Sequence, residues 1–188
     1  AGVVARVAQV PLGTILATEV ERLSSFEARV NKELFGQTEA VQTVGEAIRR
    51  ARLGLSDPKR PKASFLFVGP SGVGKTTLAM QLSCKLGIPH TELDSLFHQA
   101  NWQQLENDKF VAKVEAITNK PEWILCGNYY SRIGQEIWPK ADTIVWCNLP
   151  FAVVFGRLLR RSMRRSLTRT ELWNGNRENW KIFAKDSV

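Results

Sequence analysis

Cysteine, histidine and long apolar runs are all scarce in this sequence. Its 188 residues include two histidines and three widely separated cysteines, Cys84, Cys126 and Cys147, with no C-x-x-C pair. This spacing excludes a disulfide framework and a cysteine-based zinc or redox motif, and it favours reduced cysteines packed in the core of a cytoplasmic protein. No apolar run approaches the ~18 residues of a membrane helix, and no secretory signal is recognisable. We therefore expect no membrane contact.

Acidic residues are the minority among the charged side chains. There are 26 lysines and arginines against 18 aspartates and glutamates, which gives a net charge of +8 at neutral pH. Much of the positive charge lies in residues 49–62 and 157–169, where it can serve either nucleic acid or a phosphate-bearing small molecule. No aromatic side chain interleaves with the second stretch to stack on bases, so nucleic acid is the weaker option.

A phosphate-binding motif occupies residues 69–76, Gly-Pro-Ser-Gly-Val-Gly-Lys-Thr, which match G-x-x-x-x-G-K-[ST]. The apolar run 63–68 precedes it and a helix-compatible segment begins at Thr77, a context that a chance glycine-rich turn would lack. Backbone N–H groups and the helix N-terminus bind phosphates, Lys75 reaches the terminal phosphates, and the Thr76 hydroxyl can ligate magnesium. The sequence therefore predicts an ATP and Mg²⁺ site formed by Gly69, Ser71, Gly72, Val73, Gly74, Lys75, Thr76 and Thr77.

Short apolar segments alternate with stretches of helical period in the second part of the chain. The segments are 63–68, 90–93, 122–126 and 143–147, and such alternation predicts a parallel sheet covered by helices on both faces. We therefore expect a three-layer α/β P-loop NTPase domain over residues 63–188. Because ligands bind at the carboxyl ends of parallel strands, the candidate site residues are those that follow each strand.

A helical leader is predicted over residues 1–62. Thr18 and Glu21 form a capping box that opens a helix running through Leu34. A second helix begins at Gln37 or Thr38, with an apolar stripe of Val41, Val44, Ile48 and Leu55. The arginines at its C-terminal end have two open interpretations, a solvated helix end or a phosphate contact.

Seven segments of the first part of the chain carry a family resemblance. They are 3–5 (Val-Val-Ala), 10–11 (Val-Pro), 21–23 (Glu-Arg-Leu), 35–41 (Phe-Gly-Gln-Thr-Glu-Ala-Val), 47–55, 57–61 (Asp-Pro-Lys-Arg-Pro) and 64–70. Together, over roughly residues 1–79, they resemble the start of the second ATPase module of ClpB-type AAA+ disaggregases. The resemblance implies a homo-oligomeric ring that acts on protein clients, and an adenine pocket lined by Val3, Val4, Leu34, Phe35 and Gly36. On the residues alone, these are apolar side chains beside a turn and fit a core equally well.

The resemblance changes after the P-loop. An AAA+ module continues to an apolar strand that ends in Asp-Glu, whereas the segments here end in Gly127-Asn128 and Asn148. Instead, segments 78–89, 92–96, 127–129, 141–146, 149–150, 157–161 and 171–178 resemble small P-loop kinases of the adenylate and shikimate type, in particular the topology modulation proteins. This second resemblance covers residues 63 to about 183. The chain therefore resembles a chimera, an AAA+ leader and a kinase body that share one phosphate loop.

Asp94 is the candidate group for an acceptor molecule. It follows the predicted strand 90–93, and a carboxylate at hydrogen-bond distance from an acceptor hydroxyl is what phosphoryl transfer to an alcohol uses. In shikimate-type kinases an Asp-x-Asp pair stands here; this chain has Glu92-Leu93-Asp94, which leaves a metal role for Glu92 in doubt. The alternative is that Asp94 caps the following helix.

Five arginines recur at helical spacing after Pro150: Arg157, Arg160, Arg161, Arg164 and Arg165. Like charges stacked along one helix face repel each other, which indicates an anionic partner. In the kinase relatives this region is a lid whose arginines close over the transferring phosphate, and we expect Arg157 and Arg161 in that role. A solvated face is the alternative.

These observations favour an ATP- and Mg²⁺-dependent transfer of the γ-phosphate to a small molecule, with Lys75, Asp94, Arg157 and Arg161 as catalytic residues and Thr76 as metal ligand. Two alternatives remain. One is an AAA+ ATPase fragment, for which the sequence offers no obvious glutamate to activate water. The other is a nucleotide-binding chimera without turnover.

Overall fold

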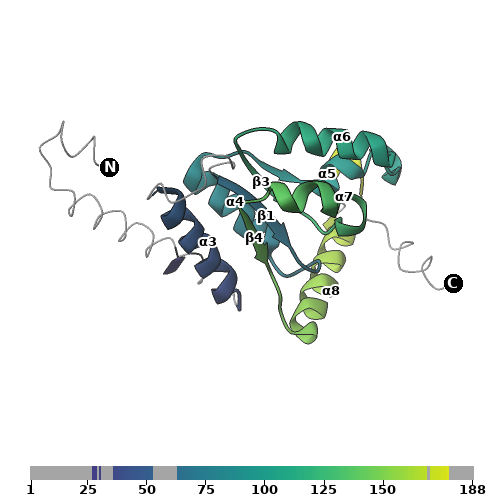
Figure 1. Cartoon of the computed structure of the whole chain (residues 1–188). Helices are drawn as coiled ribbons and strands as arrows, with labels where there is room; N and C mark the ends of the chain where they lie inside the picture. The colour runs from purple at the N-terminus through teal and green to yellow at the C-terminus, as the bar shows by residue number, and fades with distance from the viewer. Residues whose placement is uncertain (1–26, 29, 31–35, 53–62, 169, 178–188) are drawn as a thin grey trace, which may run out of the picture.

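The computed structural model describes residues 27, 28, 30, 36–52, 63–168 and 170–177 (Figure 1). The helices are α3 (Thr38–Arg52), α4 (Lys75–Leu86), α5 (Leu93–Phe97), α6 (Asn107–Thr118), α7 (Tyr130–Ile137) and α8 (Phe151–Thr168). Three 3₁₀ turns accompany them, η1 (Ala100–Trp102), η2 (Trp138–Lys140) and η3 (Trp173–Gly175). The strands are β1 (Ala63–Val68), β2 (His90–Glu92), β3 (Glu122–Cys126) and β4 (Thr143–Trp146).

The four strands form one parallel sheet in the order β2-β3-β1-β4. The strand before the P-loop, β1, is therefore central, and Phe65 lies in register with Ile124 on one side and Thr143 on the other. All four strands lie where the apolar segments predict them. The sheet brings the ends of β1, β2 and β3 to one edge, where the P-loop also begins.

Helices cover both faces of this sheet, and side chains of β1 alternate between the two. Phe65 and Phe67 pack in one apolar cluster with side chains of α3 and α4, whereas Leu66 and Val68 pack in a second cluster with side chains of α5, α6 and α7. A strand buried on both faces is expected to be apolar, as β1 is apart from Ser64, whose hydroxyl is hydrogen-bonded to Lys140 and Asp142 backbone groups. The predicted three-layer α/β fold is confirmed (Figure 1).

Helix α4 begins at Lys75, two residues before the predicted start at Thr77. It begins early because Gly74, in the left-handed region with φ of 95°, turns the chain directly into the first helical residue. The helix ends at Gly87, whose left-handed conformation lets its N–H donate to the Ser83 carbonyl at 2.8 Å. The phosphate loop is thus joined to the helix N-terminus without a spacer.

Helix α3 belongs to the predicted leader and shares the first apolar cluster with the sheet. Val41, Val44 and Ile48 are buried against it, as the apolar stripe predicts. Arg49 forms an ion pair with Glu27 at 2.6 Å. Most of the predicted helix 18–34 lies outside the described residues, and the domain boundary at residue 62 stays a prediction.

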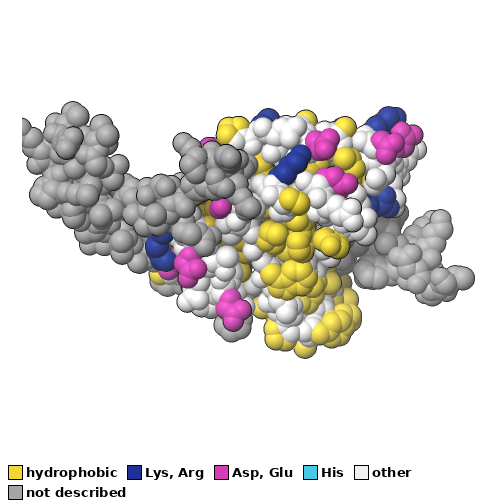
Figure 2. Space-filling view, in the orientation of Figure 1, with side chains coloured by type: hydrophobic (Ala, Val, Ile, Leu, Met, Phe, Trp, Pro, Cys, Tyr) yellow, Lys and Arg dark blue, Asp and Glu magenta, His cyan; other side chains and the backbone are white. Residues whose placement is uncertain are grey.

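Helix α8 is amphipathic and leaves one apolar side exposed. Val154 is buried against the body, whereas Phe151, Phe155, Leu159 and Leu167 are exposed, with Phe151 at 79%. Figure 2 shows apolar side chains gathered over the region of α8. Within the described part of the chain, no helix has the length and apolar character needed to cross a membrane.

The three cysteines are free thiols with different environments. Cys126 and Cys147 are buried at strand ends, and burial raises the pKa of Cys126 to about 12 and that of Cys147 to about 11. Cys84 is exposed, so the expectation that all three lie in the core is wrong for Cys84. It is on the solvent side of α4, whose buried side is formed by Leu78, Ala79 and Leu82.

Candidate nucleotide-binding site

The P-loop approaches neighbouring backbone more closely than a side chain would permit. A Cβ atom built on Gly69 would lie 2.1 Å from the carbonyl oxygen of Cys147, and the φ of Gly69 is 139°. Gly72, with φ of 87°, faces Leu158 of α8, and an added Cβ would lie 3.1 Å from its Cγ. The glycines are therefore required by the shape of the loop, and they leave its backbone open to phosphates.

A cavity of about 310 Å³, here called the P-loop cavity, lies over this loop. It is lined by Gly72, Gly74, Lys75, Thr76, Thr77, Arg157 and Arg161. The structure thus brings the predicted lid arginines Arg157 and Arg161 to the predicted phosphate site. Lys75 lies over the loop and donates to the Pro70 carbonyl at 3.3 Å. The Thr76 hydroxyl is 3.6 Å from the Cys126 sulfur.

The remaining predicted P-loop residues have different positions. Ser71 is exposed and lines a larger, neighbouring cavity, whereas Val73 is fully buried in the first apolar cluster. Val73 therefore anchors the loop through its side chain. Only its backbone is available to a nucleotide.

A second cavity of about 820 Å³, here called the large cavity, adjoins the first. It shares Lys75, Thr76, Thr77 and Arg161 with the P-loop cavity and extends to Glu92, Asp94, His98 and Arg165. Asp94 is therefore placed near the P-loop as predicted. It is not the N-cap of α5, because Glu92 occupies that position and makes no capping hydrogen bond.

Tyr129 holds the Asp94 carboxylate in place. The Tyr129 hydroxyl donates to Oδ1 of Asp94 at 2.7 Å. Burial and the hydrogen bond to Asp94 raise the pKa of Tyr129 far above its ordinary value, so the hydroxyl remains a donor. The sequence analysis did not identify this contact, since a tyrosine 35 positions along the chain carries no motif that links it to Asp94.

Glu92 also faces this cavity. Burial raises its pKa above the ordinary value, as does the negative charge of Asp94; a hydrogen bond from Trp173 and the charges of Arg165 and Lys75 lower it. Glu92, for which the sequence offered only a doubtful metal role, thus lies near the P-loop lysine. The signal was the Glu-x-Asp spacing at the end of a predicted strand.

The five arginines of α8 do not act as one face. Arg157, Arg161 and Arg165 line the two cavities, whereas Arg160 and Arg164 are exposed and line neither. At 100° per residue, Arg160 and Arg164 lie on one side of the arginine stripe, and Arg157, Arg161 and Arg165 lie on the side of the cavities. That these arginines bind an anion stays a prediction.

Gln37, at the start of α3, contacts the P-loop and was not among the predicted site residues. Its side-chain amide donates to the Val73 carbonyl at 3.0 Å, and the residue is 4% exposed. Gly36 and Gln37 also line a third cavity of about 420 Å³ with Trp146 and Asn148. Of the residues predicted for an adenine pocket, Gly36 is therefore at a cavity, while Val3, Val4, Leu34 and Phe35 lie outside the described residues.

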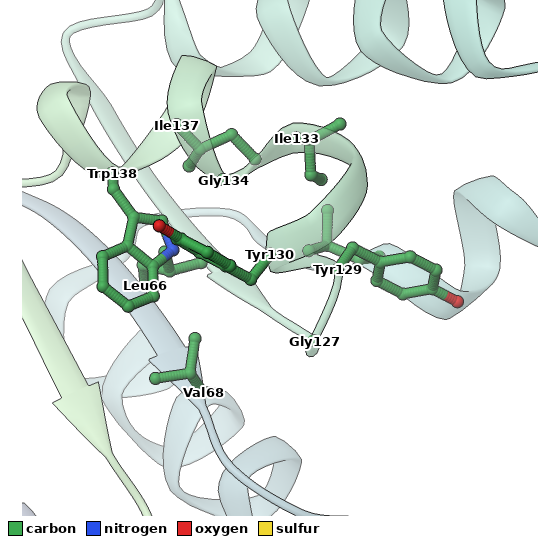
Figure 3. Close-up of a pocket in the computed structure, with 10 residues that line it drawn as sticks. Leu66, Val68, Gly127, Tyr129, Tyr130, Ile133, Gly134, Ile137 and Trp138 are labelled. Carbon is green, nitrogen blue, oxygen red and sulfur yellow. The ribbon is translucent and has the colours of Figure 1, made fainter.

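The apolar gap beside α7 is too small for a ligand. It has a volume of about 10 Å³ and lies between the sheet residues Leu66 and Val68 and the helix residues Ile133 and Ile137 (Figure 3). That volume is at most one water. Figure 3 shows Tyr129 pointing away from the Tyr130 and Trp138 pair. This direction agrees with the hydrogen bond of its hydroxyl to Asp94, which lines the large cavity.

The residues at the P-loop fit a magnesium nucleotide. Among the described residues, no group of three or more histidine, cysteine, aspartate or glutamate side chains could hold a metal by itself. Thr76, Glu92 and Asp94 nevertheless place a hydroxyl and two carboxylates around the same cavity. Magnesium prefers such oxygen ligands, and commonly takes one or two from protein and the rest from phosphates and water.

The fold and site define an α/β domain of the P-loop NTPase type. No family model matches the chain. Curated relatives match part of it: the chaperone ClpB of Corynebacterium diphtheriae is 53% identical over 74 residues, and the ATP-dependent Clp protease ATP-binding subunit ClpC of Staphylococcus epidermidis is 51% identical over 74 residues. Each match covers 39% of this chain and 9% of the relative.

The chaperone ClpB 2 of Parasynechococcus marenigrum gives a similar match, with 49% identity over 86 residues, which is 46% of this chain and 10% of the relative. The chain therefore spans about a tenth of the length of the relatives it matches. These matches agree with the ClpB resemblance. None of the three relatives is a small-molecule kinase, so the kinase resemblance receives no support from them.

A solved structure is similar over most of the chain. It is a closed-state reconstruction of Hsp104 with ATPγS and casein, with a TM-score of 0.50 and 18% identity, covering 90% of this chain and 42% of the other. At this identity the likeness concerns the fold alone. It agrees with the α/β architecture described above.

Proposed function

We propose that the chain binds ATP with Mg²⁺ through the P-loop and acts as an AAA+-like ATPase fragment. The observation that carries the proposal is the P-loop cavity, where Lys75, Thr76, Arg157 and Arg161 surround the N-terminus of α4. The similarity to ClpB and to the ATP-binding subunit ClpC supports the choice of ATP. Cytoplasmic location and nucleotide-dependent self-association belong to the same proposal.

Each predicted P-loop residue has a defined task in this proposal. Backbone N–H groups of the loop would bind the phosphates, Lys75 would leave the Pro70 carbonyl for the terminal phosphates, and the Thr76 hydroxyl would hold Mg²⁺. Bound Mg²⁺ would supply neutralising charge at the phosphates. Arg157 and Arg161 would add positive charge from the opposite wall of the cavity.

Hydrolysis requires a base for the attacking water, and Glu92 is the candidate. It lies in the cavity that also contains Lys75 and Thr76, and its raised pKa moves it toward the range in which a carboxylate accepts a proton effectively. In this role Glu92 would take a proton from water while the water oxygen attacks the γ-phosphorus and ADP leaves.

The test combines binding and turnover. We expect a fluorescent ATP analogue to bind the full chain, and Lys75→Ala to weaken binding by about 100-fold or more, because the lysine is the main charge on the terminal phosphates. The exposed Lys113→Ala on α6 is the matched control. If the Lys75→Ala variant binds the ATP analogue as tightly as the wild type does, the proposal is wrong.

Turnover is followed by phosphorus NMR. ADP and free phosphate in the wild type, lost in Glu92→Gln with ATP binding retained, is the expected result. Assembly is checked by light scattering with and without ATP. Retained hydrolysis in Glu92→Gln would reject this residue as the base.

A second candidate function is phosphoryl transfer to a small acceptor, and the position of Asp94 favours it. The Tyr129 hydroxyl occupies one oxygen of this carboxylate and orients it in a cavity that adjoins the P-loop. In this reaction Asp94 takes the proton of an acceptor hydroxyl, the acceptor oxygen bonds to the γ-phosphorus, and the bond to the β-γ bridging oxygen breaks to release ADP. The large cavity is also more spacious than attack by water requires.

The same NMR experiment separates the two functions. A pool of nucleosides, nucleoside monophosphates and small hydroxy acids is added to the chain with magnesium ATP. Phosphoryl transfer produces a new phosphoester together with ADP, and Asp94→Asn abolishes it without loss of ATP binding. ADP and free phosphate at the same rate with and without the pool would reject the transfer function.

A further inference from the structure

Part of the wall of the large cavity is aromatic, and we call this part the aromatic wall. His98, Trp102 and Trp173 form it. The His98 and Trp173 rings are nearly parallel, with an interplanar angle of 20° and centroids 6.2 Å apart, and the Trp102 ring meets His98 edge-on at 5.5 Å. All three side chains are half-buried, so they present ring surface to the cavity.

Two segments more than 70 residues apart are joined to make this wall, and Asn176 joins them. The Asn176 side chain accepts a hydrogen bond from the backbone N–H of Trp102 and donates to the Gln99 carbonyl, both at 2.8 Å, and the residue is 3% exposed. Asn174 donates to the Ser95 carbonyl at 3.1 Å. Specific polar contacts therefore join the two segments. The first segment is also anchored to the second apolar cluster through the buried Phe97, whose ring meets that of His98 edge-on at 5.2 Å.

The wall also contains an unusual backbone. Asn101, Trp102 and Asn174 have φ of 58°, 58° and 56°, and they are the non-glycine residues with positive φ in the described part of the chain. This conformation is costly for a bulky residue such as tryptophan. Strain of this kind is kept where the surroundings enforce it and is concentrated at ligand sites.

The large cavity holds charges of both signs, and Glu92 is close enough to Arg165 and Lys75 for their charges to lower its pKa. Glu92, Asp94 and Glu171 are the carboxylates of the cavity, and Glu92 contacts the wall directly through its hydrogen bond with Trp173. Arg161 and Arg165 line the same cavity from α8, and Arg161 also lines the P-loop cavity. An anionic group placed against Trp173 would lie beside the Glu92 carboxylate, so an uncharged group is favoured there.

We propose that the large cavity binds a nucleoside-like molecule, with its planar ring against His98, Trp102 and Trp173 and a hydroxyl group toward Asp94. The volume of about 820 Å³ lies in the usual range for small-molecule sites. Flat, uncharged rings stack on tryptophan, and hydroxyl groups donate hydrogen bonds to carboxylates. A small carboxylic acid would instead be repelled by the carboxylates of this cavity, Glu92, Asp94 and Glu171. As an acceptor in phosphoryl transfer this ligand rests on the second candidate function, but its binding needs no turnover.

Equilibrium dialysis of the full chain with radiolabelled adenosine, guanosine and cytidine tests the proposal. A non-hydrolysable ATP analogue is present at saturation, so that a labelled nucleoside cannot report on the nucleotide site. We expect saturable binding of at least one nucleoside, and weaker or no binding of gluconate, a hydroxy acid without a ring.

Substitutions locate the bound nucleoside. Trp173→Ala should weaken its binding about 5- to 100-fold, the range for loss of one stacking partner, while Trp173→Phe should retain most of it because a ring remains. Phe151→Ala is the control, since this exposed aromatic side chain of α8 lines neither the large cavity nor the P-loop cavity, and it should change nothing. Circular dichroism checks that each variant is folded.

The outcomes distinguish this inference from the proposed function. If the ATP analogue binds but no nucleoside does, or if gluconate binds better than every nucleoside, the inference is wrong and ATP binding stands. If Trp173→Ala and Phe151→Ala have equal effects, the ligand lies elsewhere and the inference is also wrong. If the ATP analogue itself fails to bind, the proposed function is wrong as well as this inference.

Discussion

The P-loop lies between two regions that are held together in different ways. On one side, α3 packs on the sheet through Val41, Val44 and Ile48 and reaches the loop through one buried side chain, Gln37. On the other side, the segments around Trp102 and Trp173 are joined by asparagine hydrogen bonds and strained backbone around a polar cavity. Apolar packing is suited to a permanent support, whereas a wall of strained and polar groups is suited to a ligand.

The largest effect is expected from breaking the support. Ile48→Ala should lower the free energy of unfolding by about 2–5 kcal/mol, because this side chain is 2% exposed and its loss leaves a cavity in the first apolar cluster. Urea unfolding measures the change. Gln42→Ala on the exposed side of α3 is the control; equal effects of the two would show that α3 does not support the domain.

Gln37→Ala should have the next largest effect and connects the support with the site. It leaves the Val73 carbonyl of the P-loop without the amide that donates to it at 3.0 Å, which costs about 1–3 kcal/mol of unfolding free energy for a buried acceptor. ATP affinity should fall several-fold as the loop loses its anchor. Titration with a fluorescent ATP analogue at a temperature where the variant is folded measures this, and unchanged affinity would separate the support from the site.

Asn176→Ala tests the other region with a smaller cost. The wall forms few apolar contacts, so the loss of hydrogen bonds from Asn176 should lower the global unfolding free energy by only about 1 kcal/mol. Nucleoside binding should fall while ATP affinity stays constant. Dialysis measures the nucleoside affinity and titration measures the ATP affinity. If both fall equally, the aromatic wall and the P-loop do not bind separate ligands.

The smallest effect is expected for Glu92→Gln. Burial raises the folded-state pKa of Glu92 above its ordinary value of 4.5, so the folded chain favours the protonated form. Stability from this group is present below pH 4.5 and is lost as the pH rises through the folded pKa. The variant should therefore melt slightly above the wild type at pH 7 and equally at pH 4. The exposed Glu136→Gln is the control, and a variant less stable at pH 7 would contradict the assigned burial effect.

Local patterns predicted most of the fold. Apolar runs located the four strands, and the 3.6-residue period located the buried side of α3, because both patterns follow from which side chains face the core. The P-loop motif located the tight loop before α4 for a similar reason: the positive φ of Gly69, Gly72 and Gly74 is a local backbone requirement. Such features are recognisable in a few consecutive residues.

The remaining parts of the site depend on distant contacts. No local pattern indicates that Tyr129 holds Asp94, or that Asn176 joins residues 99 and 102 to the C-terminal segment. Residues 173–175 form a 3₁₀ turn with a left-handed Asn174, which no local pattern indicates. Hydrogen bonds to Ser95 and to other residues of the wall override the local preference there.

By itself the sequence determined the α/β class, the order of strands and helices along the chain, and the position of a phosphate loop at residues 69–76. These follow from short-range periodicity and from the backbone freedom of glycine. The tertiary structure decided which polar groups meet. Glu92 and Asp94 share a cavity with Lys75, two of the five arginines of α8 line the same cavity, and aromatic side chains form part of its wall. These contacts depend on the order of the strands in the parallel sheet, which brings the ends of distant strands together. The spacing of residues along the sequence does not give that order.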